Sequence, residues 1–249
     1  MQKIASYSVP QNDYLEAMAR QLYDYWFVQF EFPDENGNPY KASGGKMVWN
    51  EKLKREIPVP WEGNTLKNTL DLFDAKRVPL SSIQRSSMKG PYPYYGATGI
   101  MDHINDYIFD GEYILLAEDG STASADGSPI VQYIWGKNWV NNHAHIILPK
   151  VRADIHFTYC LLRSIPAKMM ETGSIQKKIS QENLLKQNVI VPERRVIKLF
   201  EQFITPLWNK RMTSTTQIIE LTNQRDNLLP LLMNGQVTVR QLNNHLSAD

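Results

Sequence analysis

The feature that most constrains the fold of this 249-residue chain is a long apolar repeat near its C-terminal end. After Pro192 and Glu193, side chains recur in steps of three and four residues as far as Leu232. This is the heptad pattern of a helix that packs along another helix. A continuous helix over this stretch would be on the order of 60 Å long at 1.5 Å per residue. Its seam consists of Ile197, Phe200, Ile204, Leu207, Arg211, Ser214, Ile218, Leu221, Arg225, Leu228 and Leu232.

Several residues interrupt this seam or end it. The polar side chains of Arg211, Ser214 and Arg225 lower the stability of the packing, but they can fix its register and pairing direction. Pro206 lies inside the pattern, where it is expected to kink the helix or delay its regular part. Asn234-Gly235 is expected to end the helix.

A second, shorter helix is expected near the N-terminus. Asp13 and Glu16 match a capping box at its start, and the helix should fail by Pro33. It can cover less than half of the C-terminal seam, so we expect an intramolecular hairpin that leaves the rest of the seam for another chain. The apolar stripe of this helix contains Leu15, Met18, Leu22 and Tyr25, and Trp26 and Phe27 lengthen it.

The middle of the chain has the mixed pattern of an α+β domain. Short runs of branched and aromatic residues at 107–109, 113–116, 130–134 and 145–148 predict strands, and 154–170 predicts a helix interrupted at Pro166. We expect an α+β fold in which one mixed, β-rich domain is flanked by long helices, the last of them coiled-coil-like. The expected parts are an N-terminal helix (1–30), a linker (31–58), the β-rich domain (59–191), the long C-terminal helix (192–235) and a tail (236–249).

Composition places the chain among ordinary globular proteins. Its hydrophobic content of 42% is far above the disordered range, and no apolar run approaches the roughly 18 residues needed to cross a bilayer. The N-terminus lacks the pattern of a signal peptide, and the single cysteine, Cys160, excludes an internal disulfide framework and favours a buried side chain. We therefore expect a cytoplasmic protein that does not enter a membrane.

Net charge is unusual for a protein that would hold DNA by itself. The value is +1, whereas phosphate neutralisation normally supplies most of the affinity for DNA. Between Gly90 and Gly136 the sequence has Asp and Glu residues but no Lys or Arg, and basic residues lie on both sides of this acidic stretch. Either the chain does not bind nucleic acid, or the two basic blocks form one positive surface after folding and partners supply the remaining hold.

Catalytic motifs are absent. The sequence has no Walker A loop, no Gly-x-Gly-x-x-Gly and no His-Glu-x-x-His. His143 and His145 would face the same way on a strand, but no third ligand candidate lies nearby, so we expect no metal site. Glu118-Asp119 either closes a strand with a turn or supplies paired catalytic carboxylates, and no lysine of a nuclease motif accompanies it. We expect no catalytic residue and no cofactor.

A series of short motifs carries a family resemblance. The main group runs from Lys76 to Ser121, and shorter pieces lie in the late Thr172–Gln176 loop and in the two end helices. Together these motifs resemble a type I restriction–modification specificity (S) subunit over nearly the whole chain. The main pieces are Lys76–Ser81, Gly90–Ile100, Phe109–Tyr113, Ala117–Gly120, Thr172-Gly173-Ser174-Ile175-Gln176, Leu15–Ala19, Trp26-Phe27-Val28 and Leu228–Gly235.

The resemblance implies a non-catalytic subunit that recognises double-stranded DNA. Typical S subunits carry two target recognition domains separated by two long helices, and they bind methyltransferase subunits and, through those, restriction subunits. This chain resembles a half-length form with one target recognition domain, which would pair with a copy of itself and read a split target. The helix residues expected to pair are Leu15, Met18, Leu22, Ile197, Phe200, Ile204, Leu207, Ile218, Leu221, Arg225, Leu228 and Leu232.

Candidate DNA contacts follow from the chemistry by which side chains recognise base edges and bind phosphates. Arg, Asn and Gln distinguish base edges, while Lys, Ser, Thr and backbone amides hold phosphates. The tyrosines either contact DNA or pack in the core, and the asparagines either read bases or form a polar turn. The candidates are Lys76, Arg77, Gln84, Arg85, Lys89, Tyr92, Tyr94, Tyr95, Thr98, Ser121, Asn138, Asn141, Asn142, His143, Lys168, Thr172, Gly173, Ser174, Gln176, Lys177 and Lys178.

Two alternatives to this reading remain open at the level of sequence. The chain could be a stand-alone Mg²⁺-dependent DNA endonuclease that uses Glu118 and Asp119. It could also be a remnant of a recognition subunit that serves only as a helical scaffold.

Overall fold

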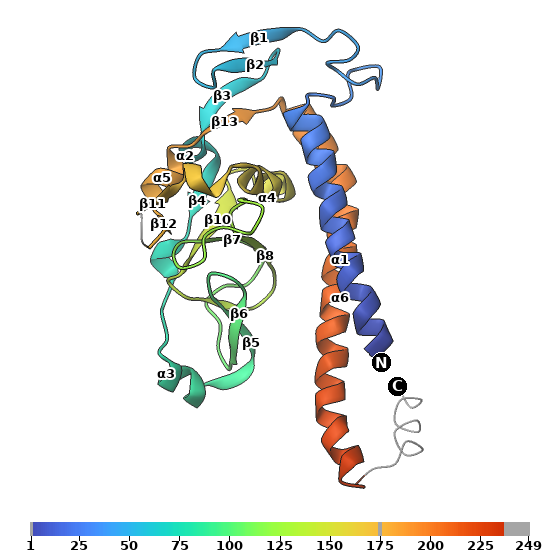
Figure 1. The fold of residues 1–249 in the computed structure, drawn as a ribbon, viewed down its shortest axis with the longest axis vertical. Coiled ribbons are helices and arrows are strands. Elements are labelled where there is room, and N and C mark those ends of the chain that lie inside the picture. The colour runs from blue at the N-terminus through green and yellow to red at the C-terminus, as the bar shows by residue number, and fades with distance from the viewer. Residues whose placement is uncertain (1, 174–175, 237–249) are drawn as a thin grey trace. The chain divides into compact units, whose positions relative to one another are not determined.

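The computed structural model describes residues 2–173 and 176–236, with side chains from residue 12 onward (Figure 1). The chain forms two compact units. Of the described residues, 2–20 and 204–236 belong to the first, which we call the helical unit, and those between 21 and 203 belong to the second, which we call the sheet unit. None of the helices in the described part of the chain is both long enough and apolar enough to span a membrane.

Two helices supply the helical unit, and each continues into the sheet unit. They are α1 (Gln2–Tyr23) and α6 (Arg194–Met233). Within the helical unit the Asn12 amide donates to the Thr215 hydroxyl at 3.0 Å, and the Arg211 guanidinium lies 3.2 Å from the Glu16 carboxylate. Leu15 is buried in the same unit. The expected intramolecular pairing of the two end helices is therefore confirmed.

The ends of these helices confirm one expectation and correct another. Helix α6 ends at Met233, and Gly235 follows with a φ of 65°, as the Asn-Gly stop predicts. Helix α1 begins at Gln2 rather than at Asp13, so the capping-box prediction was wrong. A capping box is a local signal, and Asp13 lies inside a helix whose neighbouring residue, Asn12, already bonds across to α6.

The centre of the sheet unit is a four-stranded antiparallel sheet. Its order is β4 (Leu70–Leu72), β10 (Ala144–Pro149), β7 (Tyr113–Ala117) and β8 (Val131–Ile134). Helix α4 (Ile155–Ser164) packs against β7, β8 and β10. The predicted strands at 113–116, 130–134 and 145–148 are confirmed. Most of their residues are buried, and strands that are covered on both faces have continuous apolar runs in the sequence.

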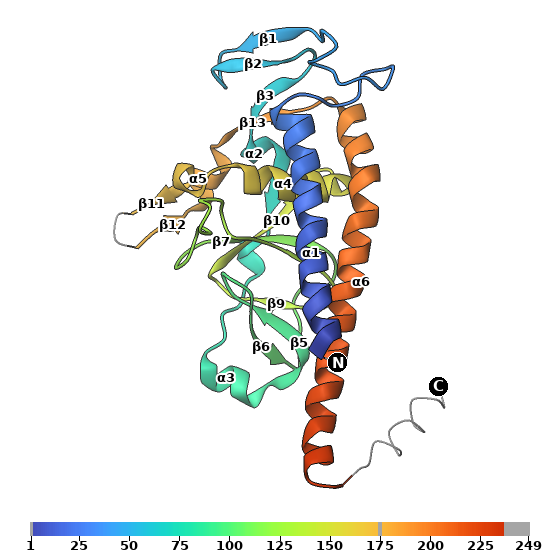
Figure 2. The same cartoon turned by 45° about the vertical axis from the view of Figure 1, so that its right-hand side comes forward.

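A second sheet, whose strands are labelled in Figure 2, has the order β6 (Ile100–Ile104), β5 (Lys89–Tyr95) and β9 (Trp139–Val140). Strand β5 is antiparallel to β6 and parallel to β9. The short helix α3 (Ser82–Ser87) precedes it, and Ser81 and Gln84 form a capping box at its start. Tyr94, Ile104 and Trp139 form the buried core of this sheet.

Smaller elements complete the sheet unit. They are the hairpin of β1 (Met47–Asn50) and β2 (Arg55–Pro58), the pair of β3 (Glu62–Thr65) and β13 (Asn188–Val191), the pair of β11 (Glu171–Thr172) and β12 (Lys178–Ile179), the helices α2 (Leu66–Thr69) and α5 (Gln181–Leu185), and the 3-10 turns at Asp74–Lys76, Arg152–Asp154 and Ala167–Met169.

Three sequence expectations need correction or refinement here. Residues 107–109 do not form a strand: the Ile108 and Phe109 N–H groups both donate to the Asn138 carbonyl, and only Phe109 makes a β-bridge, an isolated one with Asn138. The segment expected as a linker, 31–58, contains the β1–β2 hairpin. The helix expected at 154–170 ends at Ser164, before Pro166, and a 3-10 turn follows at Ala167–Met169.

An aromatic cluster joins the end of α1, α4 and the beginning of α6 within the sheet unit. Phe200 of α6 lies 5.1 Å from Phe27 and 6.4 Å from Phe157, measured between ring centroids. Tyr23 also contacts this group, and burial with loss of hydration raises the pKa of its phenol. Phe200 therefore packs into the core of the sheet unit, as does the buried Ile197, so these two seam residues are not available to a second chain.

Candidate functional site

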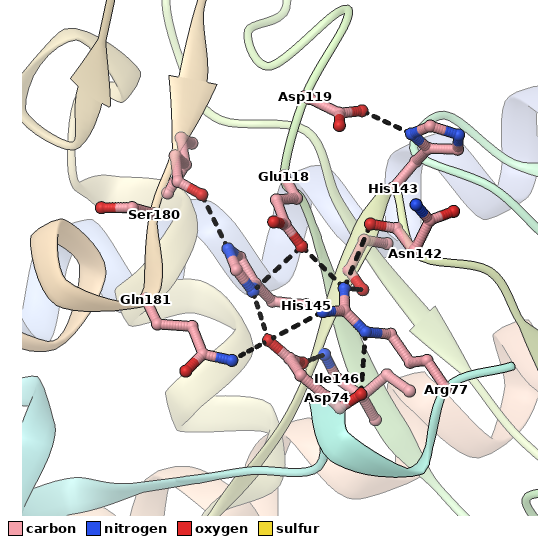
Figure 3. A network of polar contacts seen from close by, with 12 residues as sticks. Asp74, Arg77, Glu118, Asp119, Asn142, His143, His145, Ile146, Ser180 and Gln181 are labelled. Carbon is pink, nitrogen blue, oxygen red and sulfur yellow. Dashed lines mark hydrogen bonds and ion pairs between the residues drawn. The ribbon is translucent and has the colours of Figure 1, made fainter. Parts of the chain in front are cut away.

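A network of polar side chains, centred on the buried Asp74 and His145, joins the four-stranded sheet to β12 and α5 (Figure 3). Asp74, which begins the 3-10 turn after β4, has little exposed surface. Its Oδ1 accepts the Ile146 N–H at 2.8 Å, and its Oδ2 accepts the Gln181 amide at 2.6 Å. Oδ2 also lies 2.6 Å from His145 Nδ1. One carboxylate thus connects segments 71 and 107 residues away along the chain.

His145 lies at the centre of the network on strand β10. Its side chain is 1% exposed, and its Nε2 lies 2.7 Å from the carbonyl oxygen of Ile179 on β12. Burial alone would raise the pKa of Asp74, but hydrogen bonds from His145, Ile146 and Gln181 outweigh it and hold that pKa below its ordinary value. Asp74 is therefore stabilised as a carboxylate, and β12 is held against the central sheet.

Glu118, which follows the last residue of β7, forms ion pairs with the basic residues of this network. Its Oε2 lies 2.7 Å from Arg77 Nη1, and its Oε1 lies 3.0 Å from Lys178 Nζ. Arg77 Nη1 also donates to the Ala144 carbonyl at 2.8 Å. Burial raises the pKa of Glu118, but the hydrogen bonds from Arg77 and Lys178 overcome this effect and leave the pKa below its usual value.

The same network bears on metal binding. Asp74, Glu118 and His145 each place one ligand atom within 4.8 Å of the others, so the fold groups His145 with two carboxylates and not with His143, the partner that the sequence suggested. However, both carboxylates already accept hydrogen bonds from Arg77, Lys178, Gln181 or the backbone, and both nitrogens of His145 face oxygen atoms. The arrangement is typical of a satisfied structural ion network rather than of a metal centre.

His143 differs from His145 in its surroundings. It precedes β10, is exposed, and places Nδ1 2.7 Å from Asp119 Oδ1. The expectation that the two histidines share one face of a strand was wrong, because only His145 belongs to the strand. Asp119 is thereby paired with a histidine, while Glu118 is paired with Arg77 and Lys178.

Four residues of the basic blocks pair with two carboxylates of the acidic stretch. Arg77 from the first block and Lys178 from the second meet on Glu118. Lys89 lies 2.5 Å and Arg85 3.5 Å from Asp102, another residue of the acidic stretch. At these positions the basic blocks do not form the one positive surface that the sequence suggested, because their side chains pair with carboxylates of the segment between them.

The segment that contains this network matches a known family. Residues 58–224 match the model of the type I restriction modification DNA specificity domain, and this match covers more than half of the chain. The chain belongs to this family. The matched residues include both sheets, the polar network and a large part of α6.

Two curated specificity subunits are similar to this chain, and both are longer than the part that aligns with it. A type I restriction enzyme specificity subunit of Methanocaldococcus jannaschii (MjaIX) is 25% identical over 93% of this chain and 55% of its own length. An inferred type I specificity subunit of Haemophilus influenzae is 30% identical over 61% of this chain and 39% of its own length. The chain thus spans about half the length, or less, of the curated relatives it matches.

A solved structure supports the fold. The type I restriction–modification S subunit of M. genitalium superposes with a TM-score of 0.55 at 16% identity, covering 90% of this chain and 57% of that chain. At this identity the similarity concerns the fold alone.

Within the specificity domain, burial removes three of the candidate DNA contacts from the surface. Tyr94 is 1% exposed and its hydroxyl accepts the Leu80 N–H at 3.0 Å. Asn138 is 0% exposed, and the Asn141 side chain accepts the His143 N–H at 2.8 Å. The expectation of DNA contact by these three side chains is corrected, because each one stabilises a turn or a strand from inside the domain.

The other candidates keep some exposed surface. Arg77, Arg85, Tyr92 and Tyr95 are half-buried, and burial raises the pKa of Tyr95 to about 12. Ser174 lies outside the described residues. The exposed candidates are Lys76, Gln84, Lys89, Thr98, Ser121, Asn142, His143, Lys168, Thr172, Gly173, Gln176, Lys177 and Lys178.

Sequence reasoning missed the residues that organise the network. Asp74 and Gln181 were not candidates at all, and Glu118 was considered only as a catalytic carboxylate. A usable signal exists at Asp74, which is an acidic residue three positions before Arg77 at the end of an apolar strand. Nothing local marks Gln181, because its partner lies 107 residues earlier in the chain.

Proposed function

We propose that this chain is a non-catalytic DNA-recognition subunit that directs a partner methyltransferase, and through it a restriction subunit, to a split target. The observation that carries this proposal is the match of residues 58–224 to the DNA specificity domain. Residues 59–191 would form the target recognition domain, and 1–30 with 192–235 would form the helices that bind partners, with 31–58 as linker and 236–249 as tail.

The polar network supports a non-catalytic role. A nuclease that used Glu118 and Asp119 would need carboxylate oxygens free to bind a cation. Both oxygens of Glu118 instead accept from cationic side chains, and Asp119 pairs with His143. Mg²⁺-dependent DNA cleavage by the purified chain, abolished by Glu118→Gln, would be evidence for the nuclease alternative.

The charge distribution supports reading within an assembly. Several basic candidates are already paired with carboxylates, including Lys177 with Glu171 at 2.9 Å. A domain with few uncompensated cations gains little from counterion release, so its own affinity for DNA should be low. Partner subunits would then supply much of the electrostatic hold.

Sequencing of methylated sites tests the proposed function directly. DNA modified by the partner methyltransferase together with this chain should carry methyl groups at one split sequence, and DNA modified without the chain should carry no such pattern. The same chain without the methyltransferase should methylate nothing. Methylation by the purified chain alone would contradict the proposal, and unselective methylation in its presence would favour the scaffold alternative.

We also propose that the chain forms a homodimer through the C-terminal half of the seam. Leu221 is 39% exposed and Arg225 is exposed, while Ile218, Leu228 and Leu232 are only half-buried within the helical unit. An apolar seam of this kind favours burial against a second helix. A second copy would add a second recognition domain.

Charged substitutions in the seam test this pairing. The double variant Leu221→Glu/Leu228→Glu is expected to be a monomer, so its mass by light scattering should be half that of the unmodified chain, because burying four carboxylates in a dimer seam is highly unfavourable. The matched control is Asn223→Glu/Asn227→Glu, which adds the same charges to exposed positions away from the seam. An unchanged mass in the Leu variant would show that the exposed seam does not hold two copies together.

A further inference from the structure

A cluster of one cation and two aromatic rings lies outside the polar network, at the sheet β6–β5–β9, whose strands are labelled in Figure 2. The Lys137 ammonium is 4.6 Å from the centre of the Tyr107 ring and 5.9 Å from that of Tyr92. The two rings meet edge to face, with centroids 5.1 Å apart. Tyr92 belongs to β5, Tyr107 follows β6 and Lys137 precedes β9, so three segments build this cluster.

The backbone holds both sides of the cluster in place. Asn138, next to Lys137, accepts the N–H groups of Ile108 and Phe109 at 3.1 and 3.0 Å. Its own N–H donates to the Phe109 carbonyl at 2.9 Å, and its side-chain amide donates to the Gly136 carbonyl at 2.8 Å. The buried Asn138 thus fixes the segment that carries Lys137 against the segment that carries Tyr107.

Lys137 differs from the paired lysines of this domain in its charge balance. Lys89, Lys177 and Lys178 each lie within 3.0 Å of a carboxylate oxygen. Among the described residues, no carboxylate forms an ion pair with Lys137, although Asp110 is near enough to act on it electrostatically. Hydrogen bonding to the Tyr107 hydroxyl, together with the charges nearby, raises the pKa of Lys137.

A ring orients a cation without cancelling its charge. A lysine held on two rings therefore presents a full positive charge to solvent in a restricted set of conformations, which reduces the entropy lost on binding an anion. We propose that Lys137, held on Tyr92 and Tyr107, contacts a phosphate of double-stranded DNA. This inference rests on the proposed function and adds to it a contact that the sequence motifs did not suggest.

The salt dependence of DNA binding measures such a contact. Affinity of the full chain for a fluorescent mixed-sequence DNA duplex is measured between 50 and 200 mM KCl. Each neutralised phosphate contributes about 0.9 to the slope of log K against log[salt]. Lys137→Gln should therefore lower the slope by about 0.9, so that this rise in salt weakens the variant about 3-fold less than the unmodified chain.

Two variants separate a phosphate contact from other effects. Lys137→Arg keeps a cation that stacks on aromatic rings, so it should restore most of the slope. Lys54→Gln removes the same charge from an exposed residue that pairs with Glu51 on the β1–β2 turn, and it should leave the slope unchanged. An equal decrease in both Gln variants would show a general effect of net charge and overturn the proposal.

The remaining outcomes distinguish this inference from the proposed function. If the unmodified chain binds the duplex and Lys137→Gln has the same slope and affinity, the phosphate contact is refuted and DNA recognition stands. If the unmodified chain binds no duplex at 50 mM KCl, alone or with its methyltransferase, both are refuted. A Lys137→Gln variant that lost thermal stability, with an unchanged slope, would show that the cluster only braces the sheet.

Discussion

Replacement of Asp74 by Ala is expected to lower the free energy of unfolding by about 3–5 kcal/mol, the usual cost of removing one partner from a buried ionic network. The change leaves His145 Nδ1, the Ile146 N–H and the Gln181 amide without their acceptor. It also removes the carboxylate that lies 3.5 Å from the Arg77 guanidinium, whose side chain is only 13% exposed. Chemical denaturation with urea, extrapolated to water, measures the change.

A surface pair provides the comparison for this prediction. Glu51→Ala removes the carboxylate from the ion pair with Lys54, whose two side chains are 77% and 73% exposed. Exposed pairs contribute at most about 1 kcal/mol, so this variant should remain close to the unmodified chain. A similar, small loss in both variants would show that the network around Asp74 does not stabilise the sheet unit.

The lowered pKa values of Asp74 and Glu118 also predict how stability depends on pH. Both carboxyls have a lower pKa in the folded chain than their ordinary values of 3.8 and 4.5. Their contribution is therefore complete above about pH 4.5 and is lost as the pH falls through the folded-state pKa values. Asp74→Asn should flatten this acid decline, because the amide does not titrate. An equally steep decline would assign the acid sensitivity to other groups.

Replacement of Glu201 by Ala is expected to have a comparable effect, about 3–5 kcal/mol of unfolding free energy. Glu201 lies on α6 inside the sheet unit, and its Oε2 is 2.6 Å from the buried His156 Nδ1. Its Oε1 accepts the Phe157 N–H at 2.8 Å in the first turn of α4, where a helix has unpaired N–H groups. Removing the carboxylate takes the Glu201 acceptor away from both groups at once. Urea denaturation gives the magnitude.

Two further variants show whether the loss comes from unsatisfied polar groups. Glu220→Ala, at an exposed position of the same helix, should change stability by less than about 0.5 kcal/mol. The double variant Glu201→Leu/His156→Phe replaces the ion pair by an apolar pair, which can be done at little cost, but it still leaves the Phe157 N–H without the Glu201 acceptor. It should therefore recover only the part of the stability lost in Glu201→Ala that comes from His156. If the stability losses of Glu201→Leu and His156→Phe simply add in the double variant, the two side chains are not coupled and the ion pair is not the source of the loss.

Local signals predicted the elements whose own residues decide them. The branched runs identified β7, β8 and β10, and Pro166 marked the region where α4 ends. The heptad pattern placed α6 within about two residues at both ends. Local signals failed where contacts decide: α1 extends beyond its capping box, and residues 107–109 form an isolated bridge with Asn138 instead of a strand.

The candidate site was predictable in composition but not in arrangement. Arg77, Glu118 and Lys178 were each singled out from the sequence, yet Arg77 and Lys178 were expected to face DNA and Glu118 was weighed as a catalytic group. The fold places them on one another, since Glu118 is 41 residues from Arg77 and still lies 2.7 Å away. Pairing of charges over such separations depends on strand order, which no local pattern contains.

By itself, the sequence determined that the chain has a long heptad helix after an α+β domain, and that its motifs are those of specificity subunits. These properties can be read from the sequence because periodicity and motif spacing depend on residues that are close together along the chain. Tertiary structure decided which part of the seam is buried: Ile197 and Phe200 pack inside the sheet unit, while Leu221 remains partly exposed. Tertiary structure also decided which cations are compensated. A Lys or Arg side chain attracts an external anion strongly only where the fold does not bring a carboxylate from a distant part of the sequence next to it.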